Sequence, residues 1–157
     1  MLQAGLETRL YGNKKMSKLQ TPIRRNDNVV ETDFEIQVPS RARLDEFIAA
    51  VVSGDHAGAI ERYYTEDASM QENAAPPRVG RDLLVAHERA VLERVKTVTS
   101  TCVTSIVEGD HVAIHWVFDF VFQSGKIGRF DEVALQEWRG DRIFRERFFY
   151  DPSKPAG

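Results

Sequence analysis

The hydrophobic pattern changes at about Lys96, and this change constrains the fold more than any other feature of the sequence. Before Lys96, apolar residues recur every three or four positions, as they do on amphipathic helices. After Lys96, long runs rich in β-branched and aromatic residues alternate with short polar turns, as in antiparallel strands. Helices followed by a strand meander predict an α+β fold, with the helices packed on one face of a curved sheet.

Three helices and one short strand are predicted before the change. Ser40 can cap the first helix, and Gly54 ends it. The second helix runs from about His56 to Tyr64, and the third follows Gly80. The predicted buried faces are Leu44, Phe47, Ile48, Val51 and Val52; Ala57, Ile60 and one of Tyr63 and Tyr64; and Leu84, His87, Val91 and Val95. The short extended segment is Ser69–Asn73.

Four strands are predicted after the change. They are Thr97–Glu108, His111–Gln123, Gly128–Arg139 and Asp141–Tyr150. The connecting turns contain Gly109, Gly125 and Gly140. Turns this short join antiparallel neighbours, so the four strands form a meander.

The composition limits the classes of function. A chain of 157 residues fits one domain, and a net charge of -3 gives no general basic surplus for binding nucleic acid. No apolar segment has the length of a membrane span, so no membrane association is predicted. Cys102 is the only cysteine, which excludes an intrachain disulfide and fits a reducing compartment; a cytoplasmic location is predicted.

The predicted boundaries are a mobile N-terminal tail at 1–39, a folded domain at 40–152 and a short C-terminal tail at 153–157. The first segment lacks the apolar stretch of a secretory signal. Its basic bias leaves a transit peptide as an alternative, although Glu7 and the scarcity of serine argue against one. Met16 is an alternative start.

Four short motifs occur in order within about residues 41–152. They are Gly54-Asp55, Tyr64-Thr65-Glu66-Asp67-Ala68, Gly80-Arg81-Asp82 and Arg145-Glu146-Arg147-Phe148-Phe149-Tyr150-Asp151-Pro152. With the order of predicted elements, they resemble the nuclear transport factor 2-like superfamily, which includes ketosteroid isomerases, SnoaL-like polyketide cyclases and limonene epoxide hydrolases. The resemblance implies a cone-shaped, cystatin-like α+β fold whose curved sheet and three helices enclose a mostly apolar pocket. Members differ in chemistry, so the resemblance alone assigns no function.

The resemblance also implies which strand residues face the pocket, because residues two apart on a strand share a face. The inward set is Phe144, Glu146, Phe148 and Tyr150 on the last strand, Phe130, Glu132, Ala134 and Gln136 on the strand before it, and His115, Val117 and Asp119 on the strand before that. An apolar row of Val112, Ile114, Trp116, Phe118, Phe120 and Phe122 would then lie on the outer face. Such a row should not face water, so a two-fold homodimer through the outer sheet face is predicted.

The catalytic groups of these families match the chain only in part. Glu72 lies where ketosteroid isomerases keep the carboxylate that moves a proton, and Glu132 lies near the place of their second acid, but Phe47 replaces their tyrosine. Asp119 matches one acid of the limonene epoxide hydrolases, whereas Met70, Glu72, Val117 and Phe148 stand at their other catalytic positions. Phe148 also replaces the aspartate of the SnoaL-like cyclases.

Glu72, Glu132 and Glu146 are therefore the main catalytic candidates, with Asp119 and His115 as predicted neighbours. Two facing carboxylates in a pocket do not readily both ionise, so one should hold a proton and serve as a general acid. The alternative is a structural network in which Glu146 contacts Gln136 and Arg129 or Arg145, with Glu72 solvated at the pocket rim. The predicted ligand-binding residues are Phe47, Tyr63, Tyr64, Met70, His87, Phe130, Gln136, Phe144, Phe148 and Tyr150.

The remaining histidines and the cysteine receive no catalytic role. His56 and His111 are predicted at surface turns, and His87 is predicted to pack in the core or line the pocket. Cys102 is predicted to act as a small apolar residue. No spacing of histidines and carboxylates matches a zinc motif, and neither a metal nor an organic cofactor is predicted.

Two functions fit these observations. The first is a cofactor-independent enzyme that isomerises, cyclises, dehydrates or hydrolyses a small apolar organic molecule by carboxylate acid/base chemistry. The second is a non-catalytic domain that binds a metabolite or serves as a dimerisation module. A protein-docking role like that of the transport factor itself has no specific support in the sequence.

Overall fold

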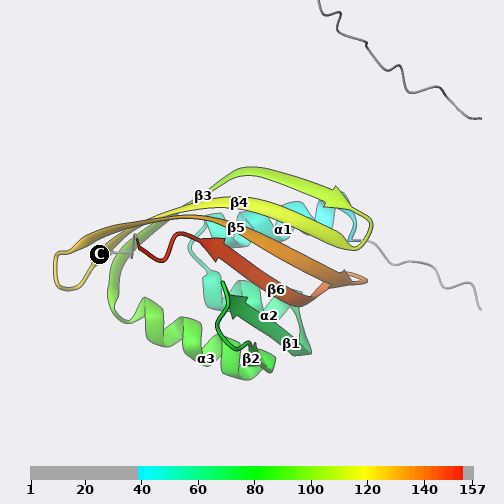
Figure 1. Cartoon of the computed structure of the whole chain (residues 1–157), viewed down its shortest axis with the longest axis horizontal. Coiled ribbons are helices and arrows are strands. Elements are labelled where there is room, and N and C mark those ends of the chain that lie inside the picture. The colour runs from blue at the N-terminus through cyan, green and yellow to red at the C-terminus, as the bar shows by residue number, and fades with distance from the viewer. Residues whose placement is uncertain (1–38, 154–157) are drawn as a thin grey trace, which may run out of the picture. The chain divides into compact units, whose positions relative to one another are not determined.

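The structure, a computed structural model, describes residues 39–153 of the chain. The predicted tails therefore lie almost entirely outside the described residues, and the predicted domain boundaries stay predictions. The described part contains three α-helices and a six-stranded sheet, which confirms the predicted α+β fold. The helices lie on one side of the curved, unclosed sheet (Figure 1).

Two of the three helices begin at a side-chain cap, Ser40 for the first and Asp55 for the second, whereas the third begins after Gly80 without one. The helices are α1 (Arg41–Val52), α2 (His56–Tyr63) and α3 (Arg81–Leu92). The Ser40 hydroxyl accepts a hydrogen bond from the Arg43 N–H at 3.1 Å, which confirms Ser40 as the cap of α1. Two details of the predicted apolar faces are wrong: Val52 is 47% exposed, and Val95 lies beyond the end of α3, in the sheet.

The sheet combines the predicted meander with a strand from the N-terminal half of the domain. Its strands are β1 (Tyr64–Glu72), β2 (Arg78–Val79), β3 (Val95–Glu108), β4 (His111–Phe122), β5 (Ile127–Arg139) and β6 (Arg142–Tyr150), in the order β2-β1-β6-β5-β4-β3. Strands β3 to β6 are antiparallel neighbours, as predicted. Strand β1 is longer than predicted and pairs parallel with β6, which brings Glu72 beside the end of the domain.

The register of β4 against β5 decides which side chains face the helices. Phe118 lies opposite Phe130, and Trp116 lies opposite Glu132. Residues directly opposite in an antiparallel pair share a face, so the even-numbered residues of both strands point the same way. The prediction that His115, Val117 and Asp119 face the pocket is wrong. It required odd-numbered residues of β4 to lie opposite even-numbered residues of β5, which the observed register excludes.

A β-bulge in the β5–β6 hairpin turns one further residue outward. Trp138 pairs with Ile143, but Glu137 pairs with Arg145, which leaves Phe144 as the extra residue. The Arg139 guanidinium carbon lies 3.6 Å from the centre of the Phe144 ring. The prediction that Phe144 lines the pocket is therefore wrong, because the bulge shifts the alternation by one position.

The hydrophobic core fills only one end of the space between the sheet and the helices. Buried residues of α1, α2 and α3 pack there against the sheet, and they include Leu44, Phe47, Ala59, Ile60, Tyr63, Leu84, Val112, Ile114, Ala134, Trp138 and Ile143. The other end of the same concave face is hollow. None of the helices within residues 39–153 combines the length and hydrophobicity needed to cross a membrane.

Candidate functional site

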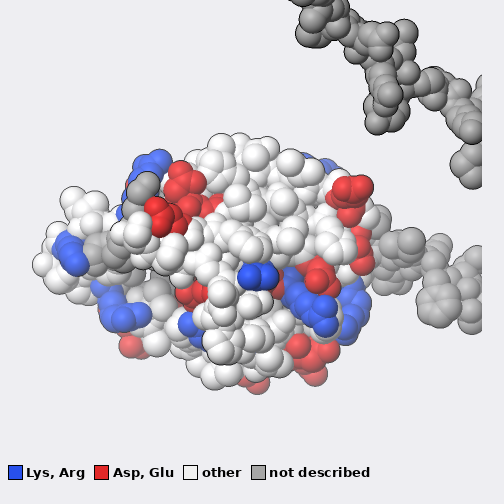
Figure 2. All heavy atoms as spheres, viewed as in Figure 1, with Lys and Arg blue, Asp and Glu red and all other residues white. Residues whose placement is uncertain are grey.

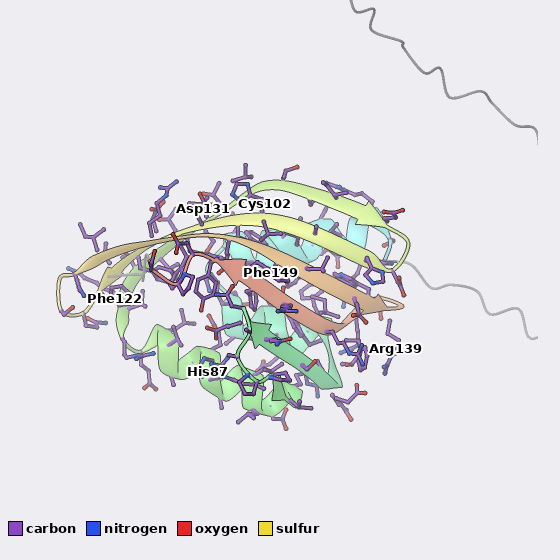
Figure 3. The ribbon with its side chains drawn as sticks, viewed as in Figure 1. His87, Cys102, Phe122, Asp131, Arg139 and Phe149 are labelled. Carbon is purple, nitrogen blue, oxygen red and sulfur yellow. The ribbon has the colours of Figure 1, made fainter. Side chains whose placement is uncertain are left out.

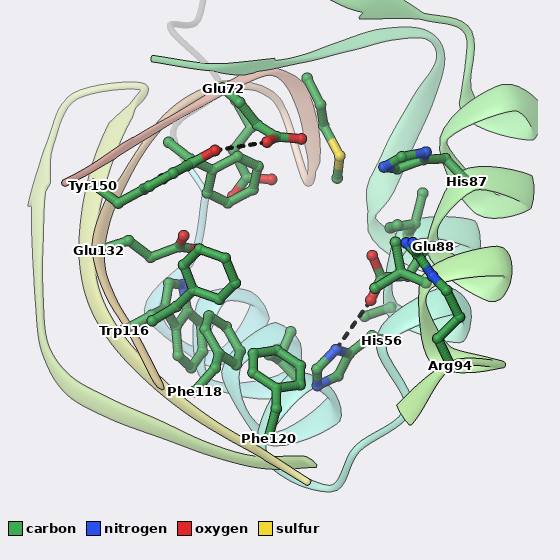
Figure 4. Close-up of a pocket in the computed structure, with 18 of the residues that line it drawn as sticks. His56, Glu72, His87, Glu88, Arg94, Trp116, Phe118, Phe120, Glu132 and Tyr150 are labelled. Carbon is green, nitrogen blue, oxygen red and sulfur yellow. Dashed lines mark hydrogen bonds and ion pairs between the residues drawn. The ribbon is translucent and has the colours of Figure 1, made fainter. Parts of the chain in front are cut away.

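A cavity of about 970 Å³ lies between the concave face of the sheet and the helices (Figure 4). One wall is a row of aromatic rings from Trp116, Phe118, Phe120 and Phe122, whose successive centroids are 5.6, 6.2 and 5.8 Å apart. This row is the one that was predicted on the outer face. Because it lines the cavity instead, it no longer supports a dimer through that face.

Glu146 is buried in the cavity wall with both carboxylate oxygens hydrogen-bonded. The Gln136 amide donates to Oε1 at 2.6 Å, and the Tyr64 hydroxyl donates to Oε2. The Trp138 indole N–H donates in turn to the Gln136 Oε1 at 3.0 Å. Burial raises the pKa of Glu146 to about 7, although the bonds from Gln136 and Tyr64 act in the opposite direction.

The structural alternative predicted that Glu146 contacts Gln136 and an arginine, and only the first of these contacts is present. Gln136 is a partner of Glu146, as predicted. The arginines are not partners, because Arg129 binds Asp119 at 3.0 Å and Arg145 binds Glu137 at 3.4 Å, both on the outer face. Gln136 is not among the residues that line the cavity, so its predicted contact with a ligand is wrong; it supports Glu146 from behind.

Glu132 points into the cavity from the sheet wall (Figure 4). Within residues 39–153, its carboxyl group has no hydrogen-bond or ion-pair partner. Burial is the main cause that raises its pKa to about 8, and the charges of Glu146, Glu72 and Glu88 contribute to the same rise. Glu132 is therefore mainly protonated at neutral pH, with its carboxyl group exposed to the interior of the cavity.

Glu72 has the opposite environment. Its Oε1 accepts a hydrogen bond from Arg78 at 2.8 Å, and its Oε2 accepts one from the Tyr150 hydroxyl at 2.8 Å. Burial alone would raise the pKa of Glu72, but the bonds from Arg78 and Tyr150 lower it below its ordinary value. Burial and the bond to Glu72 raise the pKa of Tyr150 to about 12. An ionised carboxylate with both oxygens occupied is a weak proton acceptor, which weighs against the proton-moving role implied for Glu72.

A histidine that was predicted at the surface lines the opposite wall. His56 Nε2 lies 2.8 Å from the Ser100 hydroxyl, and Nδ1 lies 3.1 Å from Glu88 Oε1. The His56 side chain is only 11% exposed, so its predicted surface position is wrong. The helical spacing His56, Ala59, Ile60, Tyr63 was the signal that places it on the buried face of α2.

The other predicted site residues divide into two groups. Those that line the cavity, with the predicted facing, are Phe47, Tyr64, Met70, His87, Phe130, Phe148 and Tyr150. Tyr63 instead lies in the core, with the Arg43 guanidinium 4.2 Å from its ring centre, so its predicted place in the pocket is wrong. His115 and Asp119 lie on the outer face, where His115 contacts Asp131 at 2.7 Å and Asp119 contacts Arg129.

Residues 39–153 contain no group of three or more His, Cys, Asp or Glu side chains placed to hold a metal ion. The cavity lining includes carboxyl, phenol and imidazole groups together with several aromatic side chains. This combination suits proton transfer to and from an organic molecule.

Comparison with known proteins places this geometry in a family. A model of the SnoaL-like domain matches residues 44–146, which is well over half of the chain. The chain belongs to this family. No curated protein matches the sequence of this SnoaL-like chain.

Solved structures of the same fold agree with the assignment. A protein from Mesorhizobium loti, proposed to be a SnoaL-like polyketide cyclase, is 26% identical, with a TM-score of 0.60 over 69% of this chain and 97% of that chain. A ketosteroid isomerase-like protein from Catenulispora acidiphila, in complex with trimethylamine, is 19% identical, with a TM-score of 0.63 over 73% and 89%. A proposed isomerase from Bacillus subtilis is 20% identical, with a TM-score of 0.60 over 71% and 86%. At these identities, the last two show the fold alone.

Proposed function

We propose that this SnoaL-like domain is a cofactor-independent enzyme that moves protons on a small, largely apolar organic substrate, with Glu132 as the general acid. The single observation that carries the proposal is the state of Glu132. Its carboxyl group points into an aromatic-lined cavity, has no partner within residues 39–153, and has its pKa raised to about 8 by burial. A general acid works best when its pKa lies near the operating pH, which this environment provides.

The surrounding residues support this role. When Glu132 donates its proton to a substrate oxygen, its own carboxylate forms beside the charge of Glu146. This charge makes Glu132 a weaker acid, so it gives its proton only to an oxygen that becomes basic in the transition state. Tyr150 lies directly opposite Glu132 on β6, and its hydroxyl is held by Glu72. Glu72 and Glu146 thus line the same cavity as Glu132, and their charges raise its pKa. The proposal keeps all three predicted carboxylates in the site and gives the proton-donating role to one of them.

The substrate class follows from the shape and lining of the cavity. A volume of about 970 Å³ is at the upper end of the range for small-molecule sites. The stacked rings of β4, with Phe130 and Phe148, favour a flat and mostly apolar molecule that carries a carbonyl or similar oxygen. The relative proposed to be a SnoaL-like polyketide cyclase is consistent with such substrates.

Proton exchange at the carbon next to a ketone tests the proposal without knowledge of the natural substrate. The probe is 2-tetralone in D₂O, followed by NMR, with the wild-type protein and the variants Glu132→Gln and Asp119→Asn. We expect the protein to catalyse the exchange and Glu132→Gln to slow it by about 100-fold. Asp119→Asn, on the outer face, is the matched control and should exchange at the wild-type rate. Binding of the ketone with no exchange would favour the non-catalytic alternative.

The homodimer stays a proposal, now on different residues. Val133, Leu135 and Phe149 are exposed on the outer face of β5 and β6, where Val133 lies opposite Phe149. In the view of Figure 2, the upper middle of the described part is uncharged, and a basic side chain lies near the centre. Phe149 lies near the middle of the same view (Figure 3). A second copy stacked on this patch would cover it, and sedimentation of Leu135→Glu as a monomer, with a dimeric wild type, would support the interface.

A further inference from the structure

The hydrogen bonds of Glu72, Glu146, Glu132 and Glu88 separate these cavity carboxylates into three kinds. Glu72 and Glu146 each have both oxygens bound by neighbouring donors. Glu132 has a free carboxyl group but is mainly protonated, so it is not a ready proton acceptor. Glu88, on α3, is bound through Oε1 only, and its second oxygen has no hydrogen bond within residues 39–153.

The bound oxygen of Glu88 belongs to an ordered chain of three groups. His56 lies between Glu88 and Ser100, with its two ring nitrogens 3.1 Å and 2.8 Å from their oxygens. One neutral tautomer satisfies both contacts, because Nδ1–H donates to Glu88 while Nε2 accepts the Ser100 hydroxyl proton. The His56 ring is also held edge-on by Phe118, at 5.7 Å between centroids. Glu88 is therefore fixed in direction by side chains from α2, β3 and β4.

Glu88 and Glu132 face each other across the cavity, from the helix wall and the sheet wall (Figure 4). The charge of Glu88 is one of the causes that raise the pKa of Glu132, which shows that the two groups share one environment. Arg94 also lines the helix wall, but no ion pair joins it to Glu88 within residues 39–153. A substrate between these walls meets a proton donor on one side and an ionisable carboxylate with a free oxygen on the other.

We propose that Glu88 is the general base of this cavity and that His56 and Ser100 are the positioning residues that hold it. The proposal deepens the proposed function, on which it rests for the presence of a reactive substrate between the two walls. Glu88 takes a proton from a carbon of the substrate, and the electrons of that C–H bond move toward the substrate oxygen. Glu132 gives its proton to that oxygen, so the net charge on the substrate does not change. Glu88 then returns the proton to a different carbon while the substrate oxygen gives its proton back to Glu132, which completes an isomerisation and restores both side chains.

The test uses a probe reaction that needs a base but no proton donor. In 5-nitrobenzisoxazole, a base removes the proton on C3, the N–O bond breaks, and the electron pair leaves on the phenolate oxygen as 2-cyano-4-nitrophenolate, whose colour is followed. The molecule is flat and aromatic, which suits the ring wall of the cavity. The variants are Glu88→Gln, Glu132→Gln, His56→Ala, Ser100→Ala and Glu61→Gln. Glu61 is exposed on α2, pairs with Arg89 and does not line the cavity, so its variant is the matched control.

We expect Glu88→Gln to lower the kcat of this ring opening by about 100-fold or more, while Glu61→Gln leaves it unchanged. His56→Ala should lower kcat by about 10-fold with KM unchanged, because the base loses its direction and the ring wall keeps binding the probe. Ser100→Ala leaves the His56–Glu88 contact in place and should have a smaller effect of the same kind. If His56→Ala does not fold, Ser100→Ala carries this part of the test.

The outcomes separate this inference from the proposed function. A wild-type rate in Glu88→Gln, or a wild-type protein no faster than the same concentration of acetate, overturns the role of Glu88. A loss of ring opening in Glu88→Gln together with normal ketone exchange in Glu132→Gln keeps the base and removes the proposed acid. A change of KM alone in His56→Ala would make His56 a binding residue and overturn its positioning role.

Discussion

The two faces of the sheet place neighbouring carboxylates in opposite environments. Asp131 and Glu132 are consecutive on β5, yet Asp131 lies on the outer face with a side chain that is 67% exposed and in contact with His115. Glu132 lies in the cavity without a partner within residues 39–153, and its pKa is raised to about 8. The residue type is almost the same, so the face of the sheet on which each residue lies determines its environment. The reactive chemistry of this domain therefore depends on which residues the register turns inward.

The largest effect expected from this contrast is on the pH dependence of stability. Folding raises the pKa of Glu132 above its ordinary value of 4.5, so the folded state binds more protons than the unfolded state between pH 4.5 and about 8. The free energy of unfolding should therefore fall as the pH rises through this range. Glu132→Gln cannot ionise and should lose this part of the slope, gaining on the order of 2–4 kcal/mol over the wild type above pH 8.

Urea denaturation at a series of pH values measures this difference. Glu137→Gln, on the outer face of the same strand and paired with Arg145, is the control for the loss of an exposed carboxyl group, and its curve is compared with that of the wild type over the same range. Parallel curves for Glu132→Gln and the wild type would show that Glu132 is solvated, which would remove the distinction between the two faces.

A smaller effect is expected from the hydrogen bonds that hold Glu146. Tyr64→Phe removes the donor to Oε2 and leaves a buried carboxylate oxygen without a partner. We expect a loss of about 1–3 kcal/mol of stability at neutral pH and a further rise in the pKa of Glu146, because the bond from Tyr64 lowers it. Carboxyl titration by NMR and urea denaturation measure the two changes.

The neighbouring Tyr63→Phe is the control for this change. Tyr63 packs against Phe47 in the core, and its hydroxyl does not serve a buried carboxylate. Equal losses of stability in the two variants would show that the Tyr64 hydroxyl contributes nothing specific through Glu146.

The sequence predicts the elements of this fold well because their signals are local. The cap Ser40, the period of the apolar residues and the glycine turns all act within a few positions. The concave facing of β5 and β6 was also predicted, through the family resemblance. The facing of β4 was not, because it depends on a pairing register that a one-residue error reverses completely. The predicted facing of Phe144 was wrong for the same reason, because the bulge shifts the pairing by one residue.

The site was predicted less completely than the fold. Glu72, Glu132 and Glu146 do line one cavity, but their differences in acidity depend on partners far away in sequence, such as Tyr64 for Glu146. Glu88 was not among the predicted residues, although it lies four positions after the buried Leu84 and three before Val91. A glutamate on an exposed-looking helix gives no local sign that a histidine on another helix will bind it. Contacts of this kind follow from tertiary packing alone.

The smallest effect is expected on the outer face, at the residue that the sequence suggested as catalytic. Asp119 pairs with Arg129 across β4 and β5, and both side chains are about half exposed. Exposed ion pairs contribute little, so Asp119→Asn should change the stability by less than about 0.5 kcal/mol and leave ketone exchange unchanged. Urea denaturation and the 2-tetralone assay measure both quantities on the same sample. A loss of exchange in this variant would mean that Asp119 reaches the reacting molecule. The even-numbered residues of β4 would then not face the cavity, and the concave site described above would be wrong.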